Sequence, residues 1–179
     1  MHGIIFAELK KYVEARHGND TWNTLLKEAG LGAKMYTLLN AYPDEETLAL
    51  VSTASRLTSK PVPVILEDFG EFIVPDLVSL YKAFVTPEWK TLEFIEHTEQ
   101  TIHRVVRLKS PGAKPPELKV TRVGPNELLL VYGSARKMCA VAKGISKGVA
   151  KHFGEKILLT ETACMAKGAP ECRISIKKI

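Results

Sequence analysis

The chain of 179 residues lacks several features that would assign it to a class at once. No apolar run approaches the roughly 18 residues that a membrane-spanning helix needs. The first residues, MHGIIFAE, reach a charge too early for a secretory signal, and no cleavage site follows them. No internal repeat, low-complexity segment or basic stripe interleaved with aromatic residues is evident. We therefore expect a cytoplasmic protein with no membrane partner and no nucleic-acid partner.

The charge and the length of the chain narrow the expectation further. The net charge is +5 and the sequence pI is about 9.1, but the lysines and arginines are scattered over different segments. This distribution favours solvated lysines, or a basic face for an acidic protein partner, over nucleic-acid binding. A hydrophobic content of 45% over 179 residues suits a single domain with a sizeable core.

Hydrophobic spacing predicts an α+β fold. Helical periodicity runs from Ile4 to about Phe84, with a helix ended by Gly18 and another stopped at Gly70. A long helix is expected from about Trp89 to Leu108. The remainder alternates as antiparallel strands around one helix. We expect a helical subdomain over residues 1–60, packed on an α+β subdomain of strands and helices over residues 61–179, with a ligand in the crevice between them.

Two separated motifs suggest what that ligand is. His103 lies at the edge of the apolar face of the expected long helix. Further on, a strand ends in Tyr132-Gly133-Ser134-Ala135-Arg136, whose alternate side chains would point the same way. Two hydroxyls and a guanidinium suit a pair of carboxylates. An imidazole combined with an anion clamp favours a flat, acidic, metal-bearing ligand such as heme b.

The same residues carry a family resemblance over essentially the whole chain. It resembles the heme NO/O2-binding (H-NOX) family, the bacterial relatives of the heme domain of soluble guanylate cyclase. The matching segments are Met1-His2-Gly3-Ile4-Ile5, Gly18-Asn19-Asp20-Thr21-Trp22, and His103…Pro115-Pro116…Tyr132-x-Ser134-x-Arg136. The combination of the Tyr-x-Ser-x-Arg element with a histidine at this distance upstream is specific, whereas either part alone would be weak.

The resemblance implies a role for each matching residue. His103 would be the proximal iron ligand, and Pro116 would press on the porphyrin and distort it. Tyr132, Ser134 and Arg136 would hold the heme propionates. Arginine suits that task because its planar guanidinium binds a carboxylate through two parallel hydrogen bonds.

The distal side of the expected heme site indicates which gas is bound. Some members of the family use a tyrosine, aided by tryptophan and asparagine, to hold oxygen. The aligned positions here are the aliphatic residues Val141, Leu9 and Ile73, with Ile5 nearby. Without a hydrogen-bond donor, oxygen loses more stabilisation than nitric oxide does. We therefore expect a stand-alone sensor, not an enzyme, that binds NO or CO and excludes O2.

The signalling route is implied by the resemblance. Nitric oxide would break the bond between the iron and His103, and the lobes would then shift against each other. The partner would be a histidine kinase or a cyclic-di-GMP enzyme. Two alternatives remain open: a heme enzyme such as a peroxidase or an NO-detoxifying enzyme, and a heme-free zinc or thiol redox module.

The three cysteines form a separate candidate site. Cys164 and Cys172 bracket a predicted turn, and Cys139 lies shortly after Arg136. Several bacterial H-NOX proteins look similar here, with three cysteines and a histidine binding zinc. In this chain Glu161 stands where that histidine would fall, and a carboxylate is an unusual ligand in a structural thiolate site. A zinc site, a thiol switch and three free thiols all remain open.

Overall fold

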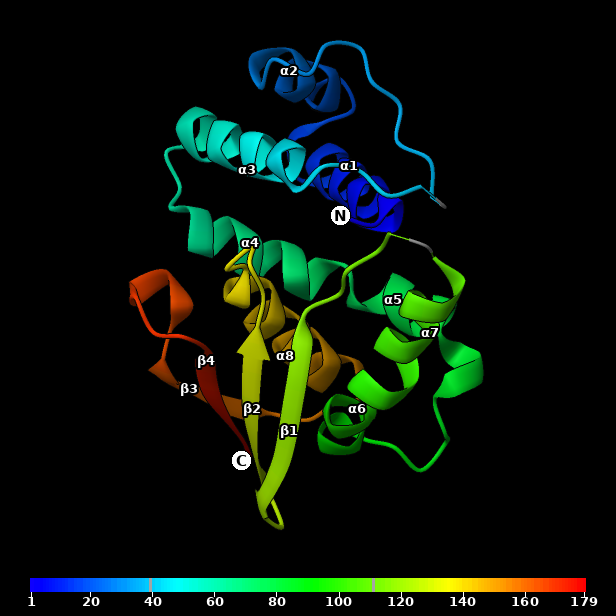
Figure 1. Ribbon diagram of the computed structural model, residues 1–179, viewed down its shortest axis with the longest axis vertical. Coiled ribbons are helices and arrows are strands. Elements are labelled where there is room, and N and C mark those ends of the chain that lie inside the picture. Colours follow the sequence, from blue (N-terminus) through cyan, green and yellow to red (C-terminus); the bar gives the residue numbers. More distant parts are fainter. Residues whose placement is uncertain (39, 111) are drawn as a thin grey trace.

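The chain consists of a helical N-terminal part followed by a mixed part that contains the sheet (Figure 1). The computed structural model describes residues 1–38, 40–110 and 112–179. The helices are α1 (Gly3–His17), α2 (Thr21–Glu28), α3 (Asp44–Thr58), α4 (Val62–Phe72), α5 (Val74–Leu80), α6 (Thr91–His97), α7 (Arg104–Lys109) and α8 (Cys139–His152). The strands are β1 (Glu117–Gly124), β2 (Glu127–Gly133), β3 (Ile157–Ala163) and β4 (Cys172–Lys178). In the described part of the chain, no helix is both long and apolar enough to cross a bilayer.

Helices α1, α2 and α3 gather at one end of the molecule and bury a core of their own. Phe6 and Leu9 of α1 pack with Trp22 and Leu25 of α2 and with Leu50 of α3. The predicted end of α1 is confirmed, since Gly18 follows it with φ +97°, where a side chain would be strained.

The sheet is antiparallel with the strand order β1-β2-β4-β3. Residues of β2 alternate between fully buried and partly buried, as the sequence pattern predicts. The buried side chains Leu128, Leu130 and Ile174 pack with Val149 of α8 and Phe94 of α6. The predicted α+β fold class is confirmed.

Helices α4 and α8 approach each other unusually closely because glycines line their contact. A Cβ atom on Gly70 would lie 2.4 Å from the Val141 carbonyl oxygen, and one on Gly144 would lie 2.0 Å from that of Glu67. The expected stop at Gly70 is therefore wrong: α4 runs on to Phe72, and Gly70 serves backbone packing instead of helix termination. This contact fixes the position of α8 against α4.

The expected long helix over residues 89–108 is divided into three parts. Between α6 and α7 lies a π-helical turn (Glu99–His103), in which the backbone N–H of His103 donates to the Thr98 carbonyl at 3.0 Å. That bond spans one residue more than an α-helical bond. His103 is thus the last residue of a turn that is wider than an α-helical turn.

Candidate functional site

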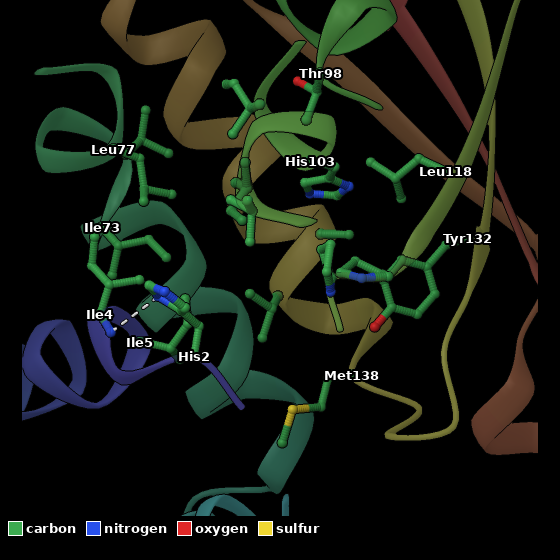
Figure 2. A pocket seen from close by; sticks show the side chains of 18 of the residues that line it. His2, Ile4, Ile5, Ile73, Leu77, Thr98, His103, Leu118, Tyr132 and Met138 are labelled. Atoms are coloured by element: carbon green, nitrogen blue, oxygen red, sulfur yellow. Dashed lines mark hydrogen bonds between the residues drawn. The ribbon is translucent and has the colours of Figure 1, made fainter. Parts of the chain in front are cut away.

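A cavity of about 230 Å³ lies where α1, α4 and α5 meet the His103 segment, β2 and α8 (Figure 2). Its lining is mostly apolar, and it brings together residues from both ends of the sequence. The expected site residues that line it are Ile5, Leu9, Ile73, His103, Pro116, Tyr132, Arg136 and Val141. Ser134 lies beside this set but does not line the cavity.

His103 enters the cavity from the π-helical turn, and its side chain is only 15% exposed. Burial lowers the pKa of His103, a shift that the hydrogen bond to Glu99 partly opposes. The imidazole is thus neutral near pH 7. Its Nδ1 lies 2.9 Å from Glu99 Oε2.

Glu99 was missed by sequence reasoning as a functional residue, although its spacing of four from His103 on a helix was visible. Burial alone would raise the pKa of Glu99, but hydrogen bonds from Arg107 and His103 hold it below its ordinary value. An ionised carboxylate only accepts hydrogen bonds, so Nδ1 of His103 carries the hydrogen. The other ring nitrogen, Nε2, therefore keeps the lone pair that a metal ligand needs.

The anion-binding end of the cavity differs in detail from the expected extended strand. Strand β2 ends at Gly133, and a turn follows in which the Lys137 N–H donates to the Ser134 carbonyl at 3.0 Å. Ser134 Oγ accepts the backbone N–H of Arg136 at 3.3 Å. The three residues are brought together by this turn as well as by strand alternation. Tyr132 is 3% exposed, and burial raises its pKa.

The Arg136 guanidinium already has protein partners. Nη2 donates to the Lys114 carbonyl at 2.6 Å, and Nη1 lies 3.2 Å from Asp44 Oδ2 at the start of α3. These contacts hold the arginine at the cavity edge in a fixed orientation. Asp44 and Lys114 carried no signal in the sequence for this role.

The opposite wall of the cavity is aliphatic at all four expected positions. Ile73 is completely buried and Leu9 is 5% exposed, while Ile5 and Val141 are partly buried. None of these four side chains has an N–H or O–H to donate. The donor-free character that the sequence suggested thus holds for residues that do lie together on the cavity wall.

Two further polar residues at the cavity were missed. Thr47 of α3 lines it, is 4% exposed, and its hydroxyl has no hydrogen-bond partner among the residues that the structure describes. His2 lines it as well; its Nδ1 accepts the Ile4 N–H, and its Nε2 lies 2.9 Å from Ser110 Oγ after α7. His2 therefore links the first turn of α1 to the end of the segment that carries His103.

The cavity fits heme by the chemistry of its donors. A neutral imidazole with a free nitrogen can bind iron, and a mostly apolar lining suits the porphyrin. A buried tyrosine and a fixed arginine at one edge suit the carboxylates. The unpartnered hydroxyl of Thr47 also suits a ligand that brings an acceptor, because burying a hydroxyl without a partner costs free energy.

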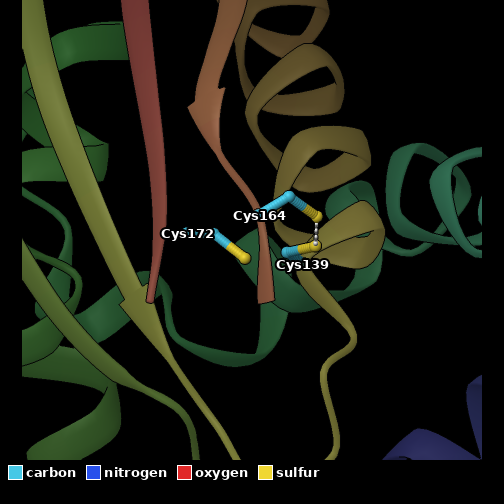
Figure 3. Close-up of side chains that lie close together, drawn as sticks. All are labelled: Cys139, Cys164 and Cys172. Carbon is cyan, nitrogen blue, oxygen red and sulfur yellow. Dashed lines mark hydrogen bonds between the residues drawn. The ribbon is translucent and has the colours of Figure 1, made fainter. Parts of the chain in front are cut away.

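The three cysteines converge at a second place, between α8, β3 and β4 (Figure 3). The sulfur atoms of Cys139, Cys164 and Cys172 all lie within 4.8 Å of one another, and all three residues are buried. Cys139 Sγ is 3.6 Å from Cys164 Sγ, and no disulfide joins them. Burial and the two neighbouring thiols raise the pKa of Cys139 to about 12.

Glu161 is not brought into this group. Its carboxylate lies 3.5 Å from Lys143 Nζ and 3.6 Å from Lys167 Nζ. Its side chain is 15% exposed, so these two lysines neutralise a largely buried charge. In the described residues, the group that could hold a metal ion thus comprises the three cysteines.

Solved structures with the same fold are H-NOX proteins. The chain superposes on an H-NOX protein from S. oneidensis in the Fe(II)NO ligation state with a TM-score of 0.93 and 27% identity, covering 100% of this chain and 99% of that one. An H-NOX domain from Shewanella oneidensis in the Fe(II)CO state gives 0.89 at 27% identity, covering 100% and 99%. The I5F mutant of T. tengcongensis H-NOX, at 23% identity and a TM-score of 0.87, covers 99% and 97% and shows the likeness of fold.

Curated relatives are longer proteins. Soluble guanylate cyclase gcy-35 of Caenorhabditis elegans is 25% identical over 162 residues, which cover 86% of this chain and 23% of that protein. Soluble guanylate cyclase 89Da of Drosophila melanogaster is 20% identical over 138 residues, covering 76% and 20%. The chain thus spans about a fifth of the length of these relatives. The Haem-NO-binding family model matches residues 2–161, and with this match over most of its length the chain belongs to the H-NOX family of heme-binding gas-sensor domains.

Proposed function

We propose that this protein is a nitric oxide sensor that excludes oxygen and passes its signal to a separate protein. His103 would hold the heme iron through Nε2, and Tyr132, Ser134 and Arg136 would hold the propionates. Pro116, which lines the cavity, would press on the porphyrin. When bound, ferrous heme supplies an open coordination position for a diatomic gas.

The single observation that carries the proposal is the aliphatic distal wall. Ile5, Leu9, Ile73 and Val141 line one cavity with His103 and offer no hydrogen-bond donor. A donor there would favour oxygen, which draws negative charge on binding, more than nitric oxide, which draws less. The wall would therefore give neither gas a hydrogen bond, so the oxygen complex would lack the stabilisation that it needs, whereas the nitric oxide complex would still form.

His103 is the residue through which the gas signal would reach the fold. If it were released from the metal, its imidazole would keep the hydrogen bond to Glu99 and would move with the π-helical turn and α7. The contact between Ser110 and His2 would carry that movement to α1. We propose residues 1–60 and 61–179 as the two subdomains that shift; the boundary falls between α3 and α4. A histidine kinase or a cyclic-di-GMP enzyme is the proposed receiver.

The cysteine group is a proposed zinc site separate from the heme. Three buried sulfur atoms within 4.8 Å supply three of the four ligands that structural zinc takes. Glu161 would complete the set only by leaving Lys143 and Lys167. The raised pKa of Cys139 keeps its thiol protonated in the metal-free protein, and zinc would displace that proton on binding.

Absorption spectra test the proposal directly. The purified protein should show a heme Soret band, and the ferrous form should form a stable complex with nitric oxide or carbon monoxide but none in air. A stable complex in air would contradict the exclusion of oxygen. A zinc assay on the same sample, with Cys164→Ser as the control, decides whether the cysteines hold metal.

A further inference from the structure

His103 is one half of a carboxylate–histidine pair that the proposed function does not require. Its Nδ1 lies 2.9 Å from Glu99 Oε2, and the two side chains are 15% and 25% exposed. The donor is Nδ1, because both Glu99 oxygens face donors: Oε2 accepts the Leu118 N–H and Oε1 faces the Arg107 guanidinium. The pair is thus a hydrogen bond from the back of the imidazole to a carboxylate, largely shielded from water.

Glu99 is held by more than His103. Oε2 also accepts the backbone N–H of Leu118 at 3.1 Å, and Oε1 pairs with Arg107 Nη1 at 2.6 Å. The Leu118 contact ties Glu99 to the first residues of β1, so the carboxylate is fixed from the sheet as well as from its own helix. The positive charge of Arg107 partly neutralises the carboxylate, which weakens the attraction of Glu99 for the His103 N–H.

A carboxylate behind a metal-bound imidazole increases the electron donation of that imidazole. The more charge Glu99 directs at Nδ1–H, the more basic Nε2 becomes and the stronger its bond to a metal. Arg107 acts in the opposite sense, because it competes for the same carboxylate. One residue therefore strengthens the tether and the other moderates it.

We propose that Glu99 is a positioning residue that sets the strength of the bond between His103 and the heme iron, and that Arg107 moderates its effect. The inference rests on the proposed function, in which that bond is the trigger. Glu99 would thus set the free energy needed to release His103 from the iron when nitric oxide binds. The π-helical turn brings the pair into line, since it begins at Glu99 and ends at His103.

Two variants should act in opposite directions on the ferrous holoprotein. Glu99→Gln keeps the shape but removes the charge, so the iron–histidine stretching frequency in resonance Raman spectra should fall. In the nitric oxide complex, the ratio of protein that has lost the His103 ligand to protein that keeps it should rise at least about tenfold, as expected for a hydrogen bond to a charged acceptor. Arg107→Met removes the competing cation, so at a pH high enough to keep Glu99 ionised the frequency should rise and the ratio of released to bound His103 should fall.

Glu96→Gln is the matched control. Glu96 lies three residues before Glu99 and pairs with Arg122 at 2.6 Å, so the variant also removes an ion-paired carboxylate from the same segment. It should leave the stretching frequency unchanged. A general loosening of the helix would shift all three variants the same way, which would overturn the inference.

The failures of the two proposals are distinguishable. Wild-type protein without a Soret band after heme supplementation would contradict the proposed function. A Soret band together with an unchanged frequency in Glu99→Gln would contradict the role of Glu99 alone.

Discussion

The two walls of the cavity are built from opposite materials. On the proximal side, His103 is held by Glu99, which in turn is held by Arg107 and by the backbone of β1. On the distal side, Ile5, Leu9, Ile73 and Val141 contribute only aliphatic groups. Hydrogen bonds are directional and fix an orientation, whereas aliphatic packing fixes only a volume. The proximal wall can therefore control the strength of the bond from His103 to a metal. The distal wall can only select a gas ligand by its size and polarity.

Among the changes to either wall, removal of His103 from the proximal wall should have the largest effect. In His103→Gly the proximal ligand is lost, so the iron–histidine band should disappear, and added imidazole should restore it by filling the space left. The exposed His152 of α8 offers the control, because His152→Gln should leave the band in place. A band that survives His103→Gly would assign the ligand to another residue.

Adding one donor to the distal wall should remove the contrast between the walls. Val141→Tyr places a hydroxyl in the cavity, and oxygen affinity should rise roughly ten- to a hundredfold, as a hydrogen bond to a partly charged acceptor implies. Val141→Phe has nearly the same size without the hydroxyl and should not bind oxygen better than wild type. Oxygen titrations of the two ferrous variants provide the comparison. Equal gains in both would attribute selectivity to volume instead of polarity.

Weakening the anion-binding edge should have a smaller effect. Arg136→Lys keeps the charge but loses the planar fork and one of the contacts to Asp44 and Lys114. Heme transfer to apomyoglobin should then become about tenfold faster. Arg173→Lys, on the exposed face of β4, is the control and should transfer heme at the wild-type rate. An unchanged rate in Arg136→Lys would remove the arginine from the propionate clamp.

The smallest effect is expected from trimming the aliphatic wall. Ile73→Val deletes one methylene from a fully buried side chain, which should lower the free energy of unfolding by about 0.5–1.5 kcal/mol. Because no hydrogen bond is involved, the preference for nitric oxide over oxygen should stay the same. Denaturant unfolding and gas titration measure the two quantities separately. A change of selectivity without a change of stability would contradict the view of this wall as packing.

Much of the fold was predictable because its signals are local. Gly18 marks the end of α1 through its positive φ, and strand alternation predicted antiparallel strands, of which β1 and β2 are a pair. Gly70 misled because a glycine needed for close helix packing looks the same in sequence as one that ends a helix. The difference depends on Val141, which lies 71 residues further along the chain.

The sequence motifs identified several residues that line the cavity. They could not identify residues that reach the site only through tertiary contacts. His103, Tyr132 and Arg136 all line the cavity as expected from their motifs. Thr47 lines the cavity and Asp44 pairs with Arg136 only because α3 packs at this end of the molecule, which no local pattern records. The position of Glu161 in the chain suggested a metal ligand. In the structure its carboxylate lies instead beside Lys143 and Lys167, with which it forms ion pairs.

The π-helical turn also makes the site depend on a residue count. Deleting a single residue would let this turn close with ordinary α-helical hydrogen bonds, which span four residues instead of five, so the change would fall on the turn that carries His103. The imidazole would then lose the direction that it has beside Glu99. Length is therefore as strict a requirement here as side-chain identity, and a one-residue deletion would cost this segment more than many substitutions.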